Sequence, residues 1–88
     1  MADTEKLITE MGKNAREVIR FRLGTINNHD FIDMRIFQKE DGRDPTPTKK
    51  GVAINPKLWP QFRAALVRVE RALVAEGWLD QEDLDDPF

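Results

Sequence analysis

Basic side chains and aromatic rings occur together in two neighbouring segments of the sequence. In residues 29–39, Phe31, Arg35, Phe37 and Lys39 fall on one side of an alternating pattern. Cations bind phosphates, and flat rings stack on exposed bases with roughly 1–3 kcal/mol for each base. Because a duplex exposes no base faces, this combination is typical of a surface that binds single-stranded nucleic acid. The candidate DNA-binding residues are Arg20, Arg22, Phe31, Arg35, Phe37, Lys39, Lys49, Lys50 and Gly51.

An alternative interpretation assigns the same residues to the protein interior. Phe31 and Phe37 would then belong to a second core layer, and the arginines would pair with Asp33, Glu17 and Asp30. The residue pattern alone leaves both interpretations open.

Acidic and basic residues are segregated along the chain. Residues 1–12 have one basic and three acidic side chains, residues 13–63 have 11 basic and six acidic ones, and residues 64–88 have two basic and seven acidic ones. The formal net charge of -2 therefore hides a basic body and an acidic C-terminal part. A basic body favours an anionic partner, although charges on small proteins also scatter unevenly.

Residue types that enzymes use as nucleophiles are missing. The sequence has no Cys, no Ser and no Tyr, and its single histidine is His29. Disulfides, cysteine-ligated zinc sites and Ser or Cys nucleophiles are therefore excluded. We predict a protein that is not an enzyme, with no catalytic residue, metal or cofactor, and we interpret His29 as a polar turn residue. The N-terminal residues are acidic, unlike the start of a signal peptide, and the sequence has no apolar run of about 20 residues. We therefore expect a soluble, intracellular protein without membrane contact.

Two alternating runs predict a β-hairpin. In residues 16–23 one side has Ile19, Phe21 and Leu23 and the other has Val18, Arg20 and Arg22. In residues 29–39 aliphatic side chains and methionine alternate with charged or aromatic ones. Residues 24–28 form the turn between them, because Asn27 and Asn28 tolerate left-handed backbone angles.

The segments on either side of this hairpin are less regular. Residues 1–14 show only a weak helical pattern, so we expect a mobile N-terminal arm with at most a short helix. Residues 40–47 contain one glycine and two prolines and predict a polar loop. Residues 48–54 predict a short extended stretch that bends at Gly51.

A long helix is predicted from Pro56 to Glu76. Asn55 is a typical N-cap, Pro56 a typical first helical residue and Gly77 a typical stop. The apolar seam of this helix comprises Trp59, Phe62, Leu66, Val69 and Leu73.

The seam predicts an oligomer. A chain of 88 residues without disulfides buries only a small core, which favours association with a second copy. Trp59 and Phe62 are expected to pack mainly on the chain's own sheet, whereas the C-terminal half of the helix extends beyond it. We therefore predict a homodimer with the interface residues Phe62, Leu66, Val69 and Leu73.

The order of these segments resembles the transcriptional coactivator family of human positive cofactor four. Ile32-Asp33-Met34-Arg35 is similar to the family's Ile-Asp-Ile-Arg. After a polar loop, residues 47–56 are similar to its Pro-x-x-Lys-Gly-Ile-x-Leu-x-Pro, and Trp59 follows three residues later, as in the family. The resemblance covers residues 16–75, approximately.

The resemblance implies an α+β fold, in which a four-stranded curved antiparallel sheet is followed by one long C-terminal helix. Two copies would pair through their helices and present their sheets as a groove. It also implies binding of single-stranded or melted DNA with little sequence preference, in transcription, replication or repair. Arg35, Lys49, Lys50 and Gly51 match family positions at or near the DNA surface, and Asn55 matches as well, although an N-cap role explains it equally.

Four positions depart from the family pattern. Ile26 stands where the family often has an aromatic residue, and His29 stands where a basic residue is common. Gln38 replaces a stacking Trp, and Thr46 replaces a loop Lys. These departures from the family pattern predict a weaker affinity for DNA or a different path of the DNA across the protein.

The end of the chain resembles the acidic tip of bacterial single-stranded-DNA-binding proteins, which also ends in aspartates followed by Pro-Phe. Residues 78–88 have five acidic side chains and no basic one, so we expect disorder in isolation. A terminal Phe can enter an apolar pocket while its carboxylate meets an Arg or Lys. The candidate docking residues are Asp85, Asp86, Pro87 and Phe88. Alternatives are a solubility tail and a tail that competes with DNA for the basic groove.

The sequence thus predicts a mobile arm over residues 1–14, a single-stranded-DNA-binding domain over 15–77 and an acidic tail over 78–88. The leading hypothesis is a homodimeric DNA-binding protein whose tail docks replication, repair or transcription proteins. The alternative is a transcription coactivator or protein-interaction module in which DNA binding is secondary. For a bacterial or phage protein, the expected location is the cytoplasm, in association with the nucleoid.

Overall fold

The central hairpin of the protein consists of β2 (Glu17–Ile26) and β3 (His29–Glu40), which pair antiparallel without a bulge. Asn27 and Asn28 connect the two strands with φ angles of 50° and 66°. Two consecutive positive φ angles are typical of a type I′ turn, whose twist matches that of the flanking strands. The predicted hairpin is therefore confirmed, but its turn is shorter than the predicted 24–28, because residues 24–26 pair with β3 as part of β2.

Strand β4 (Arg43–Ile54) includes most of the segment predicted as a loop. The turn is confined to Asp41 and Gly42, and Gly42 has a φ of 70°. The prediction of a polar loop over 40–47 is wrong because β4 lies at the edge of the sheet, where Pro45 and Pro47 are tolerated. The extended stretch over 48–54 is confirmed.

Strand β1 (Thr4–Gly12) pairs antiparallel with β2. The prediction of an N-terminal arm with at most a short helix is therefore wrong for these residues. The pairing contains a β-bulge between Leu7 and Thr9, and Ile8 is the extra residue. The bulge interrupts the alternation by which a strand is detected in a sequence.

The connection from β1 to β2 is a turn organised by Asn14. Its Oδ1 accepts hydrogen bonds of 2.9 Å from the backbone N–H groups of Arg16 and Glu17. Its Nδ2 donates to the Glu17 carboxylate at 2.8 Å, and Lys13 Nζ lies 3.1 Å from the same oxygen. The hydrogen bond from Asn14, with the smaller contribution of Lys13, lowers the pKa of the Glu17 carboxyl group.

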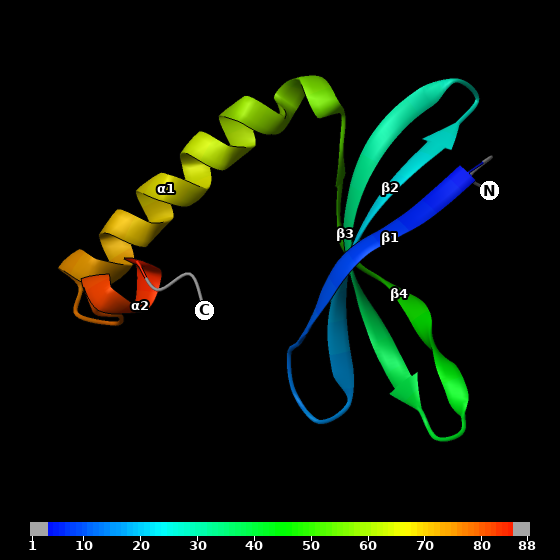
Figure 1. The fold of residues 1–88 in the computed structure, drawn as a ribbon, viewed down its shortest axis with the longest axis horizontal. Helices are drawn as coiled ribbons and strands as arrows, with labels where there is room; N and C mark the ends of the chain where they lie inside the picture. The colour runs from blue at the N-terminus through cyan, green and yellow to red at the C-terminus, as the bar shows by residue number, and fades with distance from the viewer. Residues whose placement is uncertain (1–3, 86–88) are drawn as a thin grey trace. The chain divides into compact units, whose positions relative to one another are not determined.

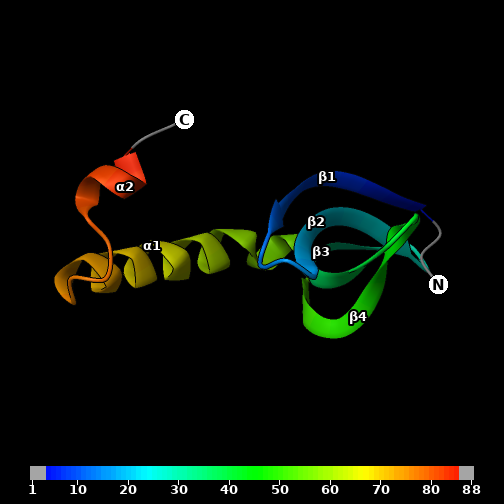
Figure 2. The same cartoon turned by 90° about the horizontal axis from the view of Figure 1, so that it is seen from below.

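The computed structural model describes residues 4–85, which divide into two units, with the boundary in the sequence after Pro56. The first unit is an open antiparallel sheet in the order β1-β2-β3-β4, and it is strongly curved (Figures 1 and 2). Register shifts in the β1–β2 and β3–β4 pairings contribute to the curvature, because bulges bend a strand and increase its twist.

The two faces of the sheet differ in chemistry. One face, called the arginine face below, combines β2 and β3 residues that lie opposite each other in the register, namely Val18, Arg20, Arg22, Gly24, Phe31, Asp33, Arg35 and Phe37. The other face is apolar and has Ile19, Phe21, Leu23, Ile32, Met34 and Ile36. The side chains of Val18, Asp33 and Phe37 are buried, whereas Leu23 is about half exposed. The most enclosed part of the sheet is therefore the face that carries the arginines.

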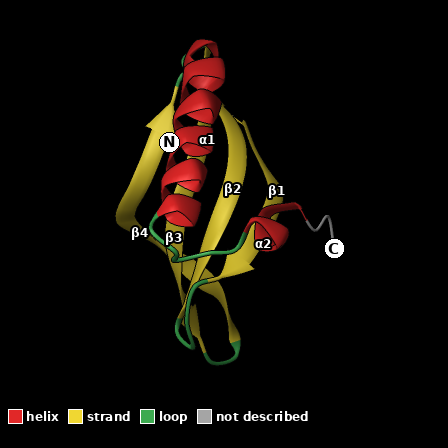
Figure 3. Ribbon diagram, turned by 90° about the vertical axis from the view of Figure 1, so that its left-hand side faces the viewer, coloured by secondary structure: helices red, strands yellow, loops and turns green. Residues whose placement is uncertain are grey.

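The second unit is helical (Figure 3). A 3₁₀ turn over Pro56–Leu58 leads into α1 (Trp59–Ala75), which has Leu58 at its N-cap. The helical segment thus begins at Pro56 as predicted, but its first turn is 3₁₀. At the C-terminal end, the N–H of Trp78 donates to the Leu73 carbonyl at 2.9 Å, and Gly77 has a φ of 76°. This is a Schellman motif and confirms the predicted stop.

Helix α1 has no buried residue in the single chain. Its predicted dimer-interface residues follow one another at spacings of four, three and four along the helix. Leu66 and Val69 are exposed, and Phe62 and Leu73 are partly exposed. The Phe62 and Trp59 rings contact each other with centroids 5.5 Å apart. An amphipathic helix with an exposed apolar seam presents a surface to a partner.

A short helix, α2 (Gln81–Asp85), occupies part of the predicted acidic tail. The Asp83 carboxylate accepts a hydrogen bond from the backbone N–H of Asp80 at 3.0 Å, and the Asp83 N–H donates back to the Asp80 carbonyl at 3.0 Å. The prediction of disorder throughout 78–88 is therefore wrong for this stretch. The candidate docking residue Asp85 ends α2, whereas Asp86, Pro87 and Phe88 lie outside the described residues.

Within residues 4–85, no helix combines the length and the apolar character that crossing a membrane requires. The same residues contain no group of three or more His, Asp or Glu side chains placed to hold a metal ion.

Candidate nucleic-acid interface

Each arginine of the arginine face has a carboxylate partner. Arg20 Nε lies 2.8 Å from an oxygen of Glu10, and Arg22 Nη1 lies 3.1 Å from an oxygen of Glu5. Arg22 also binds Asp33, as does Arg35 Nη2 at 3.3 Å. Glu5 and Glu10 belong to β1, so the strand that the sequence did not reveal supplies two of the three carboxylates in this charge network.

Asp33 is the buried centre of the network, with 1% of its surface exposed. Its Oδ2 accepts hydrogen bonds from Nε of Arg22 at 3.2 Å and from Nη2 of the same residue. Its Oδ1 faces Arg35 as an ion pair without hydrogen-bond alignment, and Arg35 Nε is buried without a hydrogen-bond partner. A buried carboxylate is tolerated only with such partners, so Asp33 fixes the positions of two predicted DNA contacts.

Phe37 lies beneath the arginines instead of being presented to solvent. It is 4% exposed, and the guanidinium carbons of Arg20 and Arg22 each lie 5.0 Å from its ring centroid. At this distance the two cations interact with the face of the ring. In the single chain Phe37 therefore supports two arginines and has no free face on which a base can stack.

The alternative interpretation of the sequence is thus correct in part. Phe37 belongs to the interior, and Asp33 pairs with two arginines. Glu17 instead binds Asn14 and Lys13, and Asp30 accepts a hydrogen bond from Thr25 Oγ1 at 2.8 Å.

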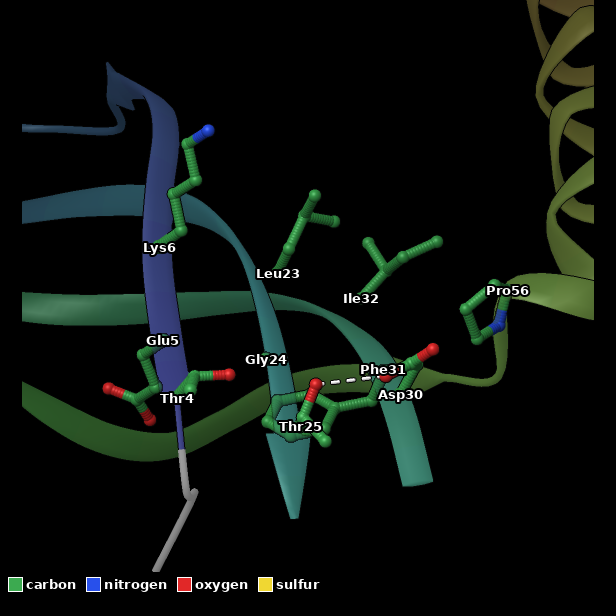
Figure 4. A pocket seen from close by; sticks show the side chains of 10 residues that line it. All are labelled: Thr4, Glu5, Lys6, Leu23, Gly24, Thr25, Asp30, Phe31, Ile32 and Pro56. Atoms are coloured by element: carbon green, nitrogen blue, oxygen red, sulfur yellow. Dashed lines mark hydrogen bonds between the residues drawn. The ribbon is translucent and has the colours of Figure 1, made fainter. Parts of the chain in front are cut away.

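Phe31 keeps a partly exposed ring near the β2–β3 turn. The ring lies across Gly24, where an added Cβ would be 2.9 Å from Phe31 Cε1. It lines an open depression of about 540 Å³, together with Leu23, Ile32 and Pro56 (Figure 4). Of the two rings predicted to stack on bases, Phe31 is therefore the more accessible one.

Lys49, Lys50 and Gly51 lie where β4 bulges away from β3. Between the pairs Arg35–Gly51 and Phe37–Pro47, three β4 residues oppose the single β3 residue Ile36. Thr48 closes the bulge, because its Oγ1 donates to the Ile36 carbonyl at 2.7 Å and accepts from the Lys50 N–H at 3.1 Å. Both lysines are exposed, and neither has an ion-pair partner in residues 4–85.

Gly51 permits the close approach that brings this bulge next to Arg35. Its φ is 145°, and a Cβ at this position would lie 2.7 Å from Arg35 Cα. The bend predicted at Gly51 is therefore confirmed. Arg35 and the two lysines thus lie at one junction of β3 and β4.

Lys39 lies at the other end of β3 with two cations that the sequence reasoning missed. Lys39, Arg16 and Arg43 line a polar cleft of about 670 Å³, and the Lys39 N–H donates to the Arg16 carbonyl at 2.8 Å. Arg16 begins the first alternating run and Arg43 follows the β3–β4 turn, so the basic pattern itself was the available signal. Glu40 and Asp41 line the same cleft and reduce its positive charge.

Comparison with known proteins agrees with this arrangement. The sequence profile of the Transcriptional Coactivator p15 (PC4) family matches residues 13–65. The crystal structure of BPSL1147, a PC4 homologue from Burkholderia pseudomallei K96243, has 27% sequence identity and a TM-score of 0.72, and the match covers 81% of this chain and 96% of that one. No curated protein matches the chain significantly.

A more distant structure shares the fold. The bacteriophage T5 homologue of the eukaryotic transcription coactivator PC4 has 17% identity and a TM-score of 0.62, with 93% of this chain and 97% of that chain covered. The four-stranded antiparallel sheet followed by a long helix is thus the fold of bacterial and phage PC4 homologues, as the sequence resemblance implied. Because the family profile matches more than half of its residues, the chain belongs to the Transcriptional Coactivator p15 (PC4) family, a family of DNA-binding proteins.

Proposed function

We propose that this protein binds single-stranded or melted DNA as a homodimer, with little sequence preference, and acts in transcription regulation, replication or repair. The observation that carries the proposal is the junction of Arg35, Lys49 and Lys50 in a family of DNA-binding proteins. Lys49 and Lys50 are exposed cations that a flexible phosphate backbone can follow, and the partly exposed Phe31 ring offers a face to an unpaired base. The T5 homologue is implicated in recombination-dependent DNA replication, which motivates the inclusion of replication.

The homodimer is proposed from the exposed seam of α1. A 17-residue helix without a buried residue gains little stability from its own chain. Pairing of Phe62, Leu66, Val69 and Leu73 with the same residues of a second copy would bury the seam and bring two sheets into one groove. For a bacterial or phage protein this function places the dimer at the nucleoid in the cytoplasm.

Replacement of Arg35 and Lys50 by alanine is expected to weaken binding of a labelled single-stranded oligonucleotide by about tenfold at about 0.1 M salt. The slope of log K against log salt should become shallower by about 1.4, since each single-strand phosphate contact contributes about 0.7. Fluorescence anisotropy with single-stranded and duplex probes at several salt concentrations measures both quantities. Arg63→Ala with Arg68→Ala removes the same charge from α1 and is the matched control. Equal wild-type affinity for the two probes, or binding without salt dependence, contradicts the proposal.

The acidic C-terminal end supports a second role for the protein, that of a docking peptide. Docking would be the main role if DNA binding is secondary. Asp85 and the neighbouring acidic residues would attract a basic rim, and Phe88 would enter an apolar pocket of a replication, repair or transcription protein. Deletion of Pro87-Phe88 is expected to abolish partner capture and to leave single-stranded-DNA affinity unchanged. Affinity measurements combined with a comparison of proteins retained by the full and shortened chains check this. Tighter DNA binding after the deletion would instead identify the tail as an internal competitor.

A further inference from the structure

Glu5 and Glu10 lie on the same face of the sheet although their spacing in the sequence is odd. In a regular strand, residues five apart point to opposite faces. The bulge at Ile8 reverses the alternation, so Glu5 lies opposite Gly24 and Glu10 opposite Arg20, two β2 positions that share the arginine face. The bulge thus directs two carboxylates of β1 onto this face.

Each carboxylate contacts one arginine and is more exposed than that arginine. The Glu10 side chain is 43% exposed and lies on Arg20, which is 23% exposed. The Glu5 side chain is 48% exposed and lies on Arg22, which is 16% exposed. Glu5 leans toward Arg22 from a position opposite Gly24, which has no side chain. Both acids therefore occupy hydrogen-bonding positions on the guanidinium groups that a phosphate of an approaching strand would also use.

The pairing removes the net charge of the arginine face. Within residues 4–85, the charges of Arg20, Arg22 and Arg35 are balanced by those of Glu5, Glu10 and Asp33. Asp33 is buried between two guanidinium groups and cannot leave without exposing them. Glu5 and Glu10 are held by exposed ion pairs, which are weak, so their side chains can rotate away while β1 stays paired.

We propose that Glu5 and Glu10 act as internal substitutes for DNA phosphates, which a single strand must displace before it can bind Arg20 and Arg22. This inference rests on the proposed function of the sheet and adds a restraint to it. The two carboxylates lower the affinity of the arginine face for any polyanion, and they make binding depend on a strand that can replace both contacts at once.

The test is the double variant Glu5→Gln with Glu10→Gln, measured by anisotropy with a labelled oligo(dT). We expect the affinity to rise by about tenfold at about 0.1 M salt. In the wild type, carboxylates displaced by DNA take up cations and offset part of the counterion release. The variant lacks these carboxylates, so its slope of log K against log salt should be steeper. Glu70→Gln with Glu76→Gln makes the same change of charge on the helical unit and should have a small effect. In a background with Arg20→Ala, Glu10→Gln should give no gain.

Three outcomes overturn the inference. In the first, the control variant tightens binding as much as the test variant, so the gain in affinity reflects total charge and not the two ion pairs. In the second, the test variant leaves affinity and salt slope unchanged while Arg35→Ala with Lys50→Ala weakens binding. The proposed function then stands, but β1 has no part in it. In the third, the gain in affinity from Glu10→Gln persists in the Arg20→Ala background. Failure of the wild-type protein to bind oligo(dT) contradicts the proposed function itself and is recognised before any variant is compared.

Discussion

Gly51→Ala is expected to destabilise the sheet by about 3 kcal/mol. The φ of 145° is unfavourable for a residue with a side chain, at about 1–3 kcal/mol. In addition, the new Cβ would contact the Met34 carbonyl oxygen and lie 2.7 Å from Arg35 Cα, and both belong to the backbone of β3. The clash can be relieved only if β4 moves away from β3. Urea unfolding followed by circular dichroism measures the loss.

Gly12→Ala is the matched control for this substitution. No atom lies within 4 Å of a Cβ built at Gly12, and its φ is not positive. The stability of this variant should stay within about 0.5 kcal/mol of the wild type. Both variants must be compared at one protein concentration, because dimerisation would link stability to concentration. A Gly51→Ala protein as stable as Gly12→Ala would show that β4 tolerates a wider separation from β3 than the register indicates.

Asp33→Ala is expected to cost about 2–3 kcal/mol. The substitution leaves Arg22 and Arg35 beside an empty buried position, and removal of one partner from a buried pair typically costs 3–5 kcal/mol. The expected cost lies at or below the lower limit of this range because both guanidinium groups keep some contact with solvent. Thermal and urea unfolding check the prediction.

Asp30→Ala provides the comparison on the same strand. Asp30 is exposed and accepts a hydrogen bond from Thr25 Oγ1 at the end of the hairpin. Loss of this bond should cost less than about 1 kcal/mol. If the two aspartate variants are equally stable, the arginines find other partners, and Asp33 does not organise the face.

The central hairpin was predictable because its local signals agree with its environment. Alternation over β2 and β3 continues without a bulge, and two asparagines accept the φ angles that a tight turn requires. The stop at Gly77 was predictable for the same reason, since the left-handed conformation there favours glycine. The Pro47–Trp59 segment carried the family resemblance, which supplied the four-stranded sheet.

Strand β1 was missed because its pattern is irregular. Leu7, Ile8 and Met11 are spaced as on a helix, but the spacing results from the extra residue of a bulge. Without β1, Glu5 and Glu10 could not be identified as partners of Arg22 and Arg20, and the sequence offers only Asp33, Glu17 and Asp30 as candidates. The first part of β4 was missed because its prolines are compatible with an edge strand as well as with a loop.

The burial of Phe37 follows from the packing of two arginine side chains over its ring, which no short sequence pattern records. Alternation places Phe37 and the arginines on one face, but does not indicate whether the rings or the cations are outermost. In the structure the cations cover the ring. The arginines therefore remain candidate phosphate contacts, whereas Phe37 becomes a support for them.

The two edges of the open sheet differ in their capacity to recruit another strand. On β4, Pro45 and Pro47 lack N–H donors, and two register shifts bend the backbone, so an incoming strand meets an incomplete ladder. On β1, the nine residues contain no proline. Growth of a fibril requires that each added chain offer a second competent edge to the next one. The prolines of β4 therefore hinder growth of the open sheet at that edge, and the β1 edge is interrupted by its own bulge at Ile8.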